Sequence, residues 1–110
     1  MTDMLRIFRY MSTFNEDISH WDVSNVIDMG AAFGSAASFN QDISNWDVSK
    51  VTNMLSMFLG ATSFNQDLSN WCVSNIKNAP DNFSKNTQSW TLPQPVWGTC
   101  PRGEDQAMPA

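Results

Sequence analysis

The chain has 110 residues and a net charge of −5, and charged residues make up only 15% of it. This length predicts one domain with a modest core, and the few, scattered Lys and Arg residues argue against nucleic-acid binding. No apolar run approaches the ~18 residues of a membrane-spanning helix, so we expect no membrane insertion.

One motif dominates the chain because it returns at a fixed interval. The string FNEDISHWDVS at residues 14–24 recurs as FNQDISNWDVS at 39–49 and as FNQDLSNWCVS at 64–74. The period is 25 residues. A fixed period between about 20 and 50 residues is typical of proteins built from stacked repeats. We therefore expect the functional residues to lie on the outer surface of the stack.

Within one repeat the apolar residues change their spacing. The alternation at Trp21 and Val23 predicts a short strand with one buried face. The three- and four-residue steps from Val26 to Met29 and Phe33 then predict a short helix. The same helix positions are Val51, Met54 and Phe58 in the second repeat and Ile76, Ala79 and Phe83 in the third.

One strand and one helix cannot bury their own apolar face, so each coil needs neighbours. The predicted fold class is an α/β repeat solenoid: a short right-handed leucine-rich-like stack of about three and a half coils, with one short parallel strand and one short helix per 25-residue coil. The predicted organisation is a partial repeat at 1–13, repeats at 14–38, 39–63 and 64–89, and a C-terminal cap and tail at 90–110, all in one domain.

Residues at equivalent positions should form ladders through the stack. The aromatic ladders are Phe14, Phe39, Phe64 and Trp21, Trp46, Trp71, and a polar ladder is Asn15, Asn40, Asn65. We expect each Asn amide to bond the backbone of its own turn or of the next coil. Trp46 lies in the middle repeat, so we expect it to be more buried than Trp21 or Trp71.

The string FNQDISNWDVSKVTNM followed by MFLGATSFNQDLSNW closely resembles the BspA-like bacterial surface-protein repeat, which also occurs in mycoplasma lipoproteins. The resemblance covers roughly residues 3–83. It implies a secreted or cell-surface array that is non-enzymatic and serves adhesion. It brings over no catalytic residue and no family-wide ligand. We expect the chain to be a fragment of a longer array that lacks its signal peptide.

Two cysteines stand in the third repeat and in the tail, at Cys72 and Cys100. An even number of cysteines in a surface-type protein predicts a disulfide, and the segment around Cys100 looks like the terminal unit of such arrays. The bridge would fold the tail over the open end of the stack as a cap. Two free thiols are the alternative. One histidine and two cysteines are too few for a metal site, so none is assigned.

The polar strand residues that alternate with buried Trp and Val should share one outward face. These partner-facing residues are His20, Asp22, Ser24, Asn45, Asp47, Ser49, Asn70 and Ser74. In leucine-rich-type solenoids this face commonly receives partners. A merely solvated sheet face is the alternative.

Carboxylates at regular steps make calcium binding an alternative. One acidic column is Asp17, Asp42, Asp67, and Asp22 and Asp47 form a second. The chain has neither the Asp-x-Asp-x-Asp-Gly loop nor the Gly-Gly-x-Gly-x-Asp nonapeptide that usually marks such sites. We expect the first column to cap turns through backbone N–H groups instead.

We assign no catalytic residue, because His20 is the only histidine and the chain has no phosphate-binding loop and no Gly-x-Ser-x-Gly motif. The predicted function is a non-enzymatic interaction module without cofactors, extracellular or at the cell surface. Its partner would be a protein or glycan on a host, the matrix or a neighbouring cell. The alternatives are a structural spacer and a repetitive face for carbohydrate, mineral or ice. Against ice, Ile27 and Ala37 interrupt the column of Thr52 and Thr62.

The N-terminal edge has a consequence for assembly. The half-repeat before Phe14 supplies no strand, so the strand with Trp21 and Val23 lacks a neighbour on one side. Open edges of parallel sheets invite pairing with another chain. We therefore expect a two-fold homodimer through the N-terminal edges.

Overall fold

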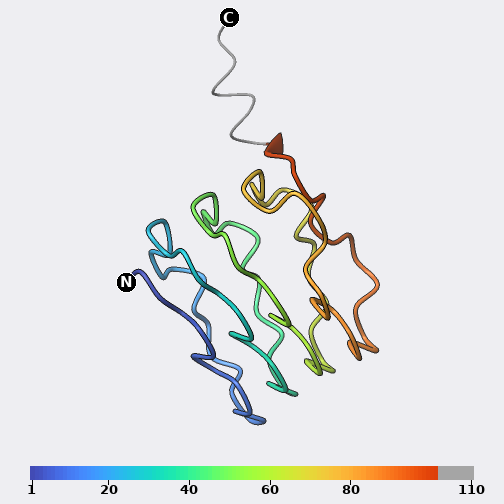
Figure 1. The fold of residues 1–110 in the computed structure, drawn as a ribbon. Coiled ribbons are helices and arrows are strands. Elements are labelled where there is room, and N and C mark those ends of the chain that lie inside the picture. The colour runs from blue at the N-terminus through green and yellow to red at the C-terminus, as the bar shows by residue number, and fades with distance from the viewer. Residues whose placement is uncertain (102–110) are drawn as a thin grey trace, which may run out of the picture.

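The structure, a computed structural model, describes residues 1–101. The chain winds through successive coils that lie side by side in a stack, with the N terminus at one end and residue 101 at the other (Figure 1). Each coil consists of a turn segment followed by a return segment. The turn segments are residues 1–13, 26–38, 51–63 and 76–89, and the return segments are 14–25, 39–50, 64–75 and 90–101. We number these coils 1 to 4; the predicted repeats cut the same period half a coil further on.

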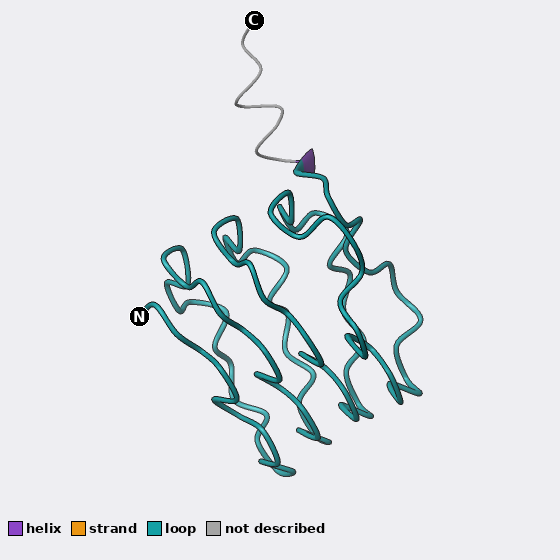
Figure 2. Ribbon diagram, in the orientation of Figure 1, coloured by secondary structure: helices purple, strands orange, loops and turns teal. Residues whose placement is uncertain are grey.

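The predicted strand and helix of each coil do not form, so the expectation of an α/β solenoid is wrong. Within residues 1–101 the only bridge pairings are isolated and parallel, Asp3 with Asp28 and Asp28 with Asn53, and Pro101 alone is helical. Figure 2 accordingly shows loops and turns along the described coils. The described residues therefore form no leucine-rich-type sheet that could serve as a binding face.

Hydrogen bonds between coils explain why neither element forms. In the turn segments alternate N–H groups donate to the next coil: that of Arg6 to Gly30 O and that of Phe8 to Ala32 O, both at 2.9 Å. The N–H groups between them bond three residues back, as that of Arg9 does to Arg6 O at 3.2 Å. A helix would instead bond every N–H to the carbonyl four residues before it. The backbone is thus satisfied by tight turns and inter-coil bonds together.

Left-handed residues recur at fixed places in the turn segments. The angle φ is 51° at Ala31 and 56° at Ser35 in coil 2, and 56° at Ser56 and 75° at Gly60 in coil 3. This conformation costs a non-glycine residue roughly 1–2 kcal/mol, so the inter-coil bonds must hold it in place. Consecutive tight turns also bring every third or fourth side chain to one face. This is why the spacing predicts a helix that does not form.

Coil 4 contains one residue more than the repeat period. The positive-φ position of Ser56 has its counterpart at Asn82, 26 residues later (82 minus 56). Phe83 therefore takes the place of Met57, and both N–H groups bond the carbonyl three residues back. The sequence alignment of Phe83 with Phe58 is wrong by this one residue.

A phenylalanine ladder runs through the core. Phe33 stacks on Phe58 with ring centroids 5.4 Å apart and planes 6° apart, and Phe39 stacks on Phe64 at 5.8 Å and 4°. All four side chains are fully buried. The ladder also includes Phe14, which is only half-buried at the N-terminal end. Stacked pairs stabilise a fold by about 0.5–1.5 kcal/mol beyond the area they bury, so the columns hold coil to coil.

The tryptophans anchor each coil to the one before it. The indole N–H of Trp46 donates to Ile18 O at 3.1 Å, and that of Trp71 to Ile43 O at 3.0 Å. Trp46 is 2% exposed and Trp71 is fully buried, so the prediction that Trp46 is the more buried of the two is wrong. Coil 4 is bonded to coil 3 on either side of Trp71, because the N–H groups of Leu68 and Val73 donate to Pro93 O and Thr99 O. Trp21 in coil 1 is half-buried, as the sequence predicts for an end coil.

The Asn ladder joins the return segments. Asn15 Oδ1 accepts the N–H of Asn40 at 2.9 Å, and Asn40 Oδ1 accepts the N–H of Asn65 at 2.8 Å. Asn65 Oδ1 accepts the N–H of Thr91 at 2.9 Å, which continues the ladder into coil 4. These amides bond the backbone of the next coil, so they hold the stack and are occupied.

Candidate functional site

The residues predicted to form a partner-facing strand lie at corners of the return segments. Asp22 Oδ1 accepts the N–H of Ser24 at 3.0 Å and its hydroxyl at 2.6 Å. Asp47 and Ser49 repeat this arrangement at the same distances. The remaining predicted residues are His20, Asn45 and Asn70, which are exposed, and Ser74, which is half-buried. The structure places all eight at turns and not in a strand.

The first acidic column caps turns in the same way. Asp17, Asp42 and Asp67 each accept the N–H of the serine two residues on at 3.0 Å. Hydrogen bonds from the serine hydroxyl, and then from its N–H, lower the pKa of these three carboxyls and that of Asp22. Within residues 1–101 no three His, Cys, Asp or Glu side chains are grouped so that they could hold a metal ion. The column serves the turns.

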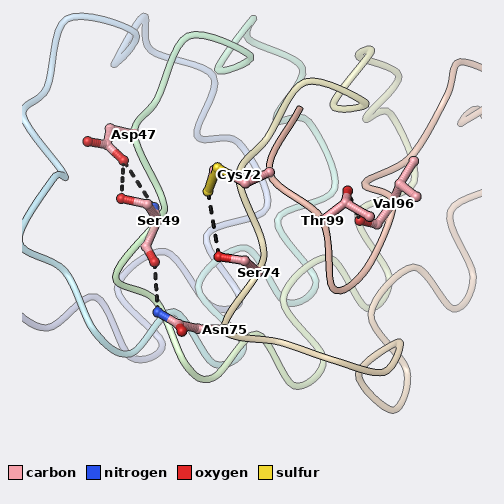
Figure 3. Close-up of a disulfide and its surroundings, with 8 residues drawn as sticks. Asp47, Ser49, Cys72, Ser74, Asn75, Val96 and Thr99 are labelled. Atoms are coloured by element: carbon pink, nitrogen blue, oxygen red, sulfur yellow. Dashed lines mark hydrogen bonds between the residues drawn. A yellow bond between two sulfur atoms is a disulfide. The ribbon is translucent and has the colours of Figure 1, made fainter. Parts of the chain in front are cut away.

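Cys72 and Cys100 form a disulfide, which is the pairing predicted from the sequence (Figure 3). It ties the return segment of coil 4 to that of coil 3. Cys72 replaces Asp47 of coil 2 at this corner, and its sulfur lies 3.8 Å from Ser74 Oγ. The corner thus exchanges a carboxylate cap for a covalent link to the last coil.

The turn segments carry a groove that the sequence did not predict. It lies over coils 1, 2 and 3 and has a volume of about 420 Å³. Its floor is the turn segment of coil 2, where Gly30, Ala31, Gly34 and Ser35 have small side chains or none. Because larger residues occupy the positions of Gly30 and Gly34 in coils 1 and 3, the floor is a depression between two walls.

The two walls differ in chemistry. Coil 1 supplies Leu5, Arg6, Arg9 and Tyr10, and coil 3 supplies Leu55 and Leu59. The exposed fraction is 43% for Leu5, 66% for Tyr10 and 48% for Leu55, so apolar surface is open to a partner. One wall is therefore basic and aromatic, and the other is aliphatic.

The groove has a signal in the sequence, in the residues that differ between repeats. The two columns that form it are Leu5, Gly30, Leu55 and Arg9, Gly34, Leu59. A search for residues that are identical from repeat to repeat does not detect such columns. A large, a small and again a large residue at intervals of one period predict a depression on the surface of the stack.

The basic wall is partly fixed by a cation–π contact. The guanidinium carbon of Arg9 lies 4.6 Å from the centroid of the Tyr10 ring. Such contacts at exposed sites stabilise by about 0.5–1 kcal/mol. Neither Arg6 nor Arg9 forms an ion pair with a carboxylate within the part of the chain that the structure describes. Both guanidinium groups are available to an anion.

One end of the groove is polar. Asp28 Oδ1 accepts the N–H of Gly30 at 2.8 Å and the amide of Asn53 at 3.0 Å. A Cβ on Gly30 would lie 2.8 Å from Asn53 Nδ2, so only glycine leaves this pair undisturbed. The glycine thus supports both the floor and the polar end.

Stacked coils with capped corners and a side-chain-lined groove define a repeat protein. The chain belongs to the family described as "Mycoplasma protein of unknown function, DUF285", whose model matches residues 1–93. This span includes every residue of the groove. No curated protein and no solved structure matches the chain. Among the described residues, no helix has the length and apolar character that crossing a membrane requires.

Proposed function

We propose that the chain is a non-enzymatic interaction module of a mycoplasma surface protein and that the groove receives its partner. Membership of a mycoplasma family and the resemblance of the repeats to BspA-like surface arrays support a location at the cell surface. The disulfide also supports it, because such bonds persist mainly in oxidising compartments. The partner is a protein or a glycan outside the cell.

The groove is the observation that carries the proposal. Its side chains stand on a backbone whose turn segments are bonded to the neighbouring coils, so little conformational entropy is lost when a partner orders them. Its walls offer exposed apolar surface beside two arginines, which is a common composition of binding surfaces. Inter-coil bonding alone does not require such walls.

A structural spacer is the second candidate. The Phe, Trp and Asn ladders are enough to make a stiff stack, and a spacer would need nothing else. The two functions differ in one respect, since only the interaction module needs Leu5, Arg9 and Leu55 at the surface.

Capture by arrays of glycans and matrix proteins tests the proposal. We expect the intact chain to bind at least one array member and Leu55→Asp to weaken that binding. Ile27→Asp is the matched control, because Ile27 is 52% exposed, close to the 48% of Leu55, but does not line the groove. A folded chain that binds nothing on either array would favour the spacer. Equal effects of the two variants would contradict the groove as the binding surface.

A further inference from the structure

We propose that the groove binds a carbohydrate that carries a carboxylate or sulfate group. This inference rests on the proposed function, because it names the ligand class of the same groove. Three features of the groove carry it: arginines without an ion-pair partner, a polar end suited to hydroxyl groups, and a floor whose main-chain N–H groups are all bonded.

The basic wall selects for an anion. The chain has a net charge of −5 and only six basic residues, yet two of them, Arg6 and Arg9, line this one groove. Guanidinium groups present paired N–H donors that match the oxygens of a carboxylate or a sulfate. Tyr10 holds the Arg9 guanidinium at 4.6 Å, which limits the freedom that binding would remove.

The polar end suits hydroxyl groups. Asn53 donates to Asp28 Oδ1 through one amide hydrogen and accepts the N–H of Leu55 at 2.9 Å through its oxygen. The second amide hydrogen of Asn53 and Asp28 Oδ2 have no hydrogen-bond partner within residues 1–101. A hydroxyl both donates and accepts, so it can use both groups. A carbohydrate supplies several hydroxyls close to one anionic group.

The floor disfavours an extended peptide. Every N–H from Gly30 to Ser35 is already bonded, either within its own turn or to coil 3. The carbonyls of Gly30, Ala32 and Gly34 accept N–H groups of coil 1. A peptide that adds to a protein as a strand gains its affinity from main-chain bonds in both directions, and no N–H group of this floor is open to it. Recognition in this groove therefore depends mainly on side chains.

The size and the apolar walls complete the fit. A volume of about 420 Å³ lies within the roughly 300–1,000 Å³ of small-ligand sites. Leu5, Leu55 and Tyr10 expose apolar surface on opposite walls, against which the C–H face of a sugar ring can pack. The combination of anion, hydroxyls and apolar ring face is found in acidic sugars.

Titration calorimetry of the full chain with four probes tests the ligand class. The probes are a hyaluronan tetrasaccharide, a sulfated tetrasaccharide without carboxylates, neutral chitotetraose and tetraglutamate. We expect one or both acidic oligosaccharides to bind about tenfold or more tightly than chitotetraose, as loss of a charged hydrogen bond implies. The two acidic probes distinguish carboxylate from sulfate. Tetraglutamate binding as tightly as the better oligosaccharide, or no difference from chitotetraose, would overturn the proposal.

Paired variants locate the site. Arg6→Asn with Arg9→Gln removes both charges, and Asn is chosen because φ is 58° at Arg6. Lys50→Gln with Lys77→Gln removes the same charge outside the groove. We expect the arginine pair to weaken binding about tenfold or more and the lysine pair to stay within about twofold. Equal losses in the two pairs would mean non-specific charge attraction and would overturn the site.

A third variant fills the groove and keeps both arginines. A Cβ on Gly34 would lie 3.5 Å from Arg9 Cγ and 3.4 Å from Ala31 O, which the surroundings can accommodate, so Gly34→Leu should fold and occupy the floor. Circular dichroism of each variant checks the fold. Unchanged affinity in folded Gly34→Leu would overturn the groove as the site. Capture by matrix proteins alone, lost in Leu55→Asp, would overturn the carbohydrate and leave the interaction module standing.

Discussion

The two ends of the stack continue the same aromatic ladder but finish it differently. At the N-terminal end Phe14 lies over Phe39 with planes 11° apart and stays half-buried, as an inner coil would if its neighbour were removed. At the C-terminal end Trp90 meets Phe64 at 84°, and its indole N–H donates to Gln66 O at 3.0 Å. Phe83 likewise meets Phe58 at 81°.

This difference shows what is needed to end a stack. In the ladder each phenylalanine ring leaves a ring face exposed on which the ring of a further coil could stack. Parallel stacking alone therefore does not end the stack. Coil 4 ends it by turning its rings edge-on, by adding one residue to its turn segment, and by a disulfide to coil 3. Repeat stacks need such capping units. Coil 4 is therefore a cap by its contacts, whereas coil 1 has the contacts of an ordinary coil.

The largest expected effect is at the capped end. Phe64 is fully buried and contacts Phe39, Phe58 and Trp90. Phe64→Ala should lower the free energy of unfolding by about 3–5 kcal/mol, because it leaves a cavity beneath the cap. Urea denaturation followed by tryptophan fluorescence measures this. A loss below about 1 kcal/mol would show that coil 4 does not depend on the ladder.

Opening the disulfide should have the next largest effect. Cys100→Ser frees a loop of 28 residues, and the entropy of the unfolded chain predicts a loss of about 3 kcal/mol. Hydrogen exchange should speed up at Val73 N–H, which donates to Thr99 O at 2.8 Å, before it does so in coil 1. The wild-type protein should show no reactive thiol under oxidising conditions. A thiol titration that finds two reactive thiols per chain would show that the disulfide does not form and would refute the covalent cap.

The equivalent substitution at the open end should cost less. Phe14 occupies the same repeat position as Phe64 but is half-buried, so Phe14→Ala should lower the free energy of unfolding by only about 1–2 kcal/mol. The same urea titration gives the comparison. Equal losses at the two positions would mean that the N-terminal end is covered in solution, for example by self-association, which light scattering would detect.

The smallest expected effect is on pH dependence. Serine caps lower the pKa of four aspartates in coils 1 to 3, Asp17, Asp22, Asp42 and Asp67. A carboxyl whose pKa is lower in the folded state stabilises fully above its unfolded pKa of 3.8 and loses this stabilisation as the pH falls through its folded value. The melting temperature should therefore hold from pH 7 to about pH 5 and fall below about pH 4.

Replacing the four aspartates by Asn is the control for this fall. Asn caps the same kind of turn without a titrating charge, so the variant should lose much of the drop below pH 4. In coil 4 the corresponding positions are Pro93 and Gly98, which cannot titrate. At low pH the corners of coils 1 to 3 should therefore open before the corners of coil 4, and hydrogen exchange should be faster there. If the melting temperature of the four-Asn variant fell by the same amount below pH 4, other carboxyls would be the cause of the fall.

Sequence reasoning succeeded where a property follows from the repeat itself. The period and the Phe and Asn ladders are visible as identical residues, and the Cys72–Cys100 pairing follows from there being only two cysteines. It failed on local conformation. Consecutive tight turns give the three- and four-residue spacing of a helix, and inter-coil bonds hold non-glycine residues such as Ala31 at positive φ, which no propensity predicts.

The groove was missed for a different reason. It depends on how Gly30 differs from Leu5 and Leu55, and these residues become neighbours only once the coils are stacked in register. The same holds for the shift in coil 4. Phe83 keeps the 25-residue spacing from Phe58, but the structure gives it the position of Met57. Spacing along the chain identifies columns, and hydrogen bonds between coils decide which residues occupy them.

The direction of the inter-coil bonds gives the stack a polarity, much as a filament has unlike ends. In the turn segments most of these bonds run from the N–H groups of one coil to the coil after it, so the outer edge of coil 1 offers the carbonyls of Leu5, Ile7 and Arg9. Ile27 and Thr52 donate to the coil before them, so Thr2, at the equivalent position of coil 1, offers an N–H donor at that edge. The two-fold dimer expected from the sequence would set these acceptors against their own copies. A coil can join this edge only if it brings N–H groups in register, so growth at this end has one permitted orientation.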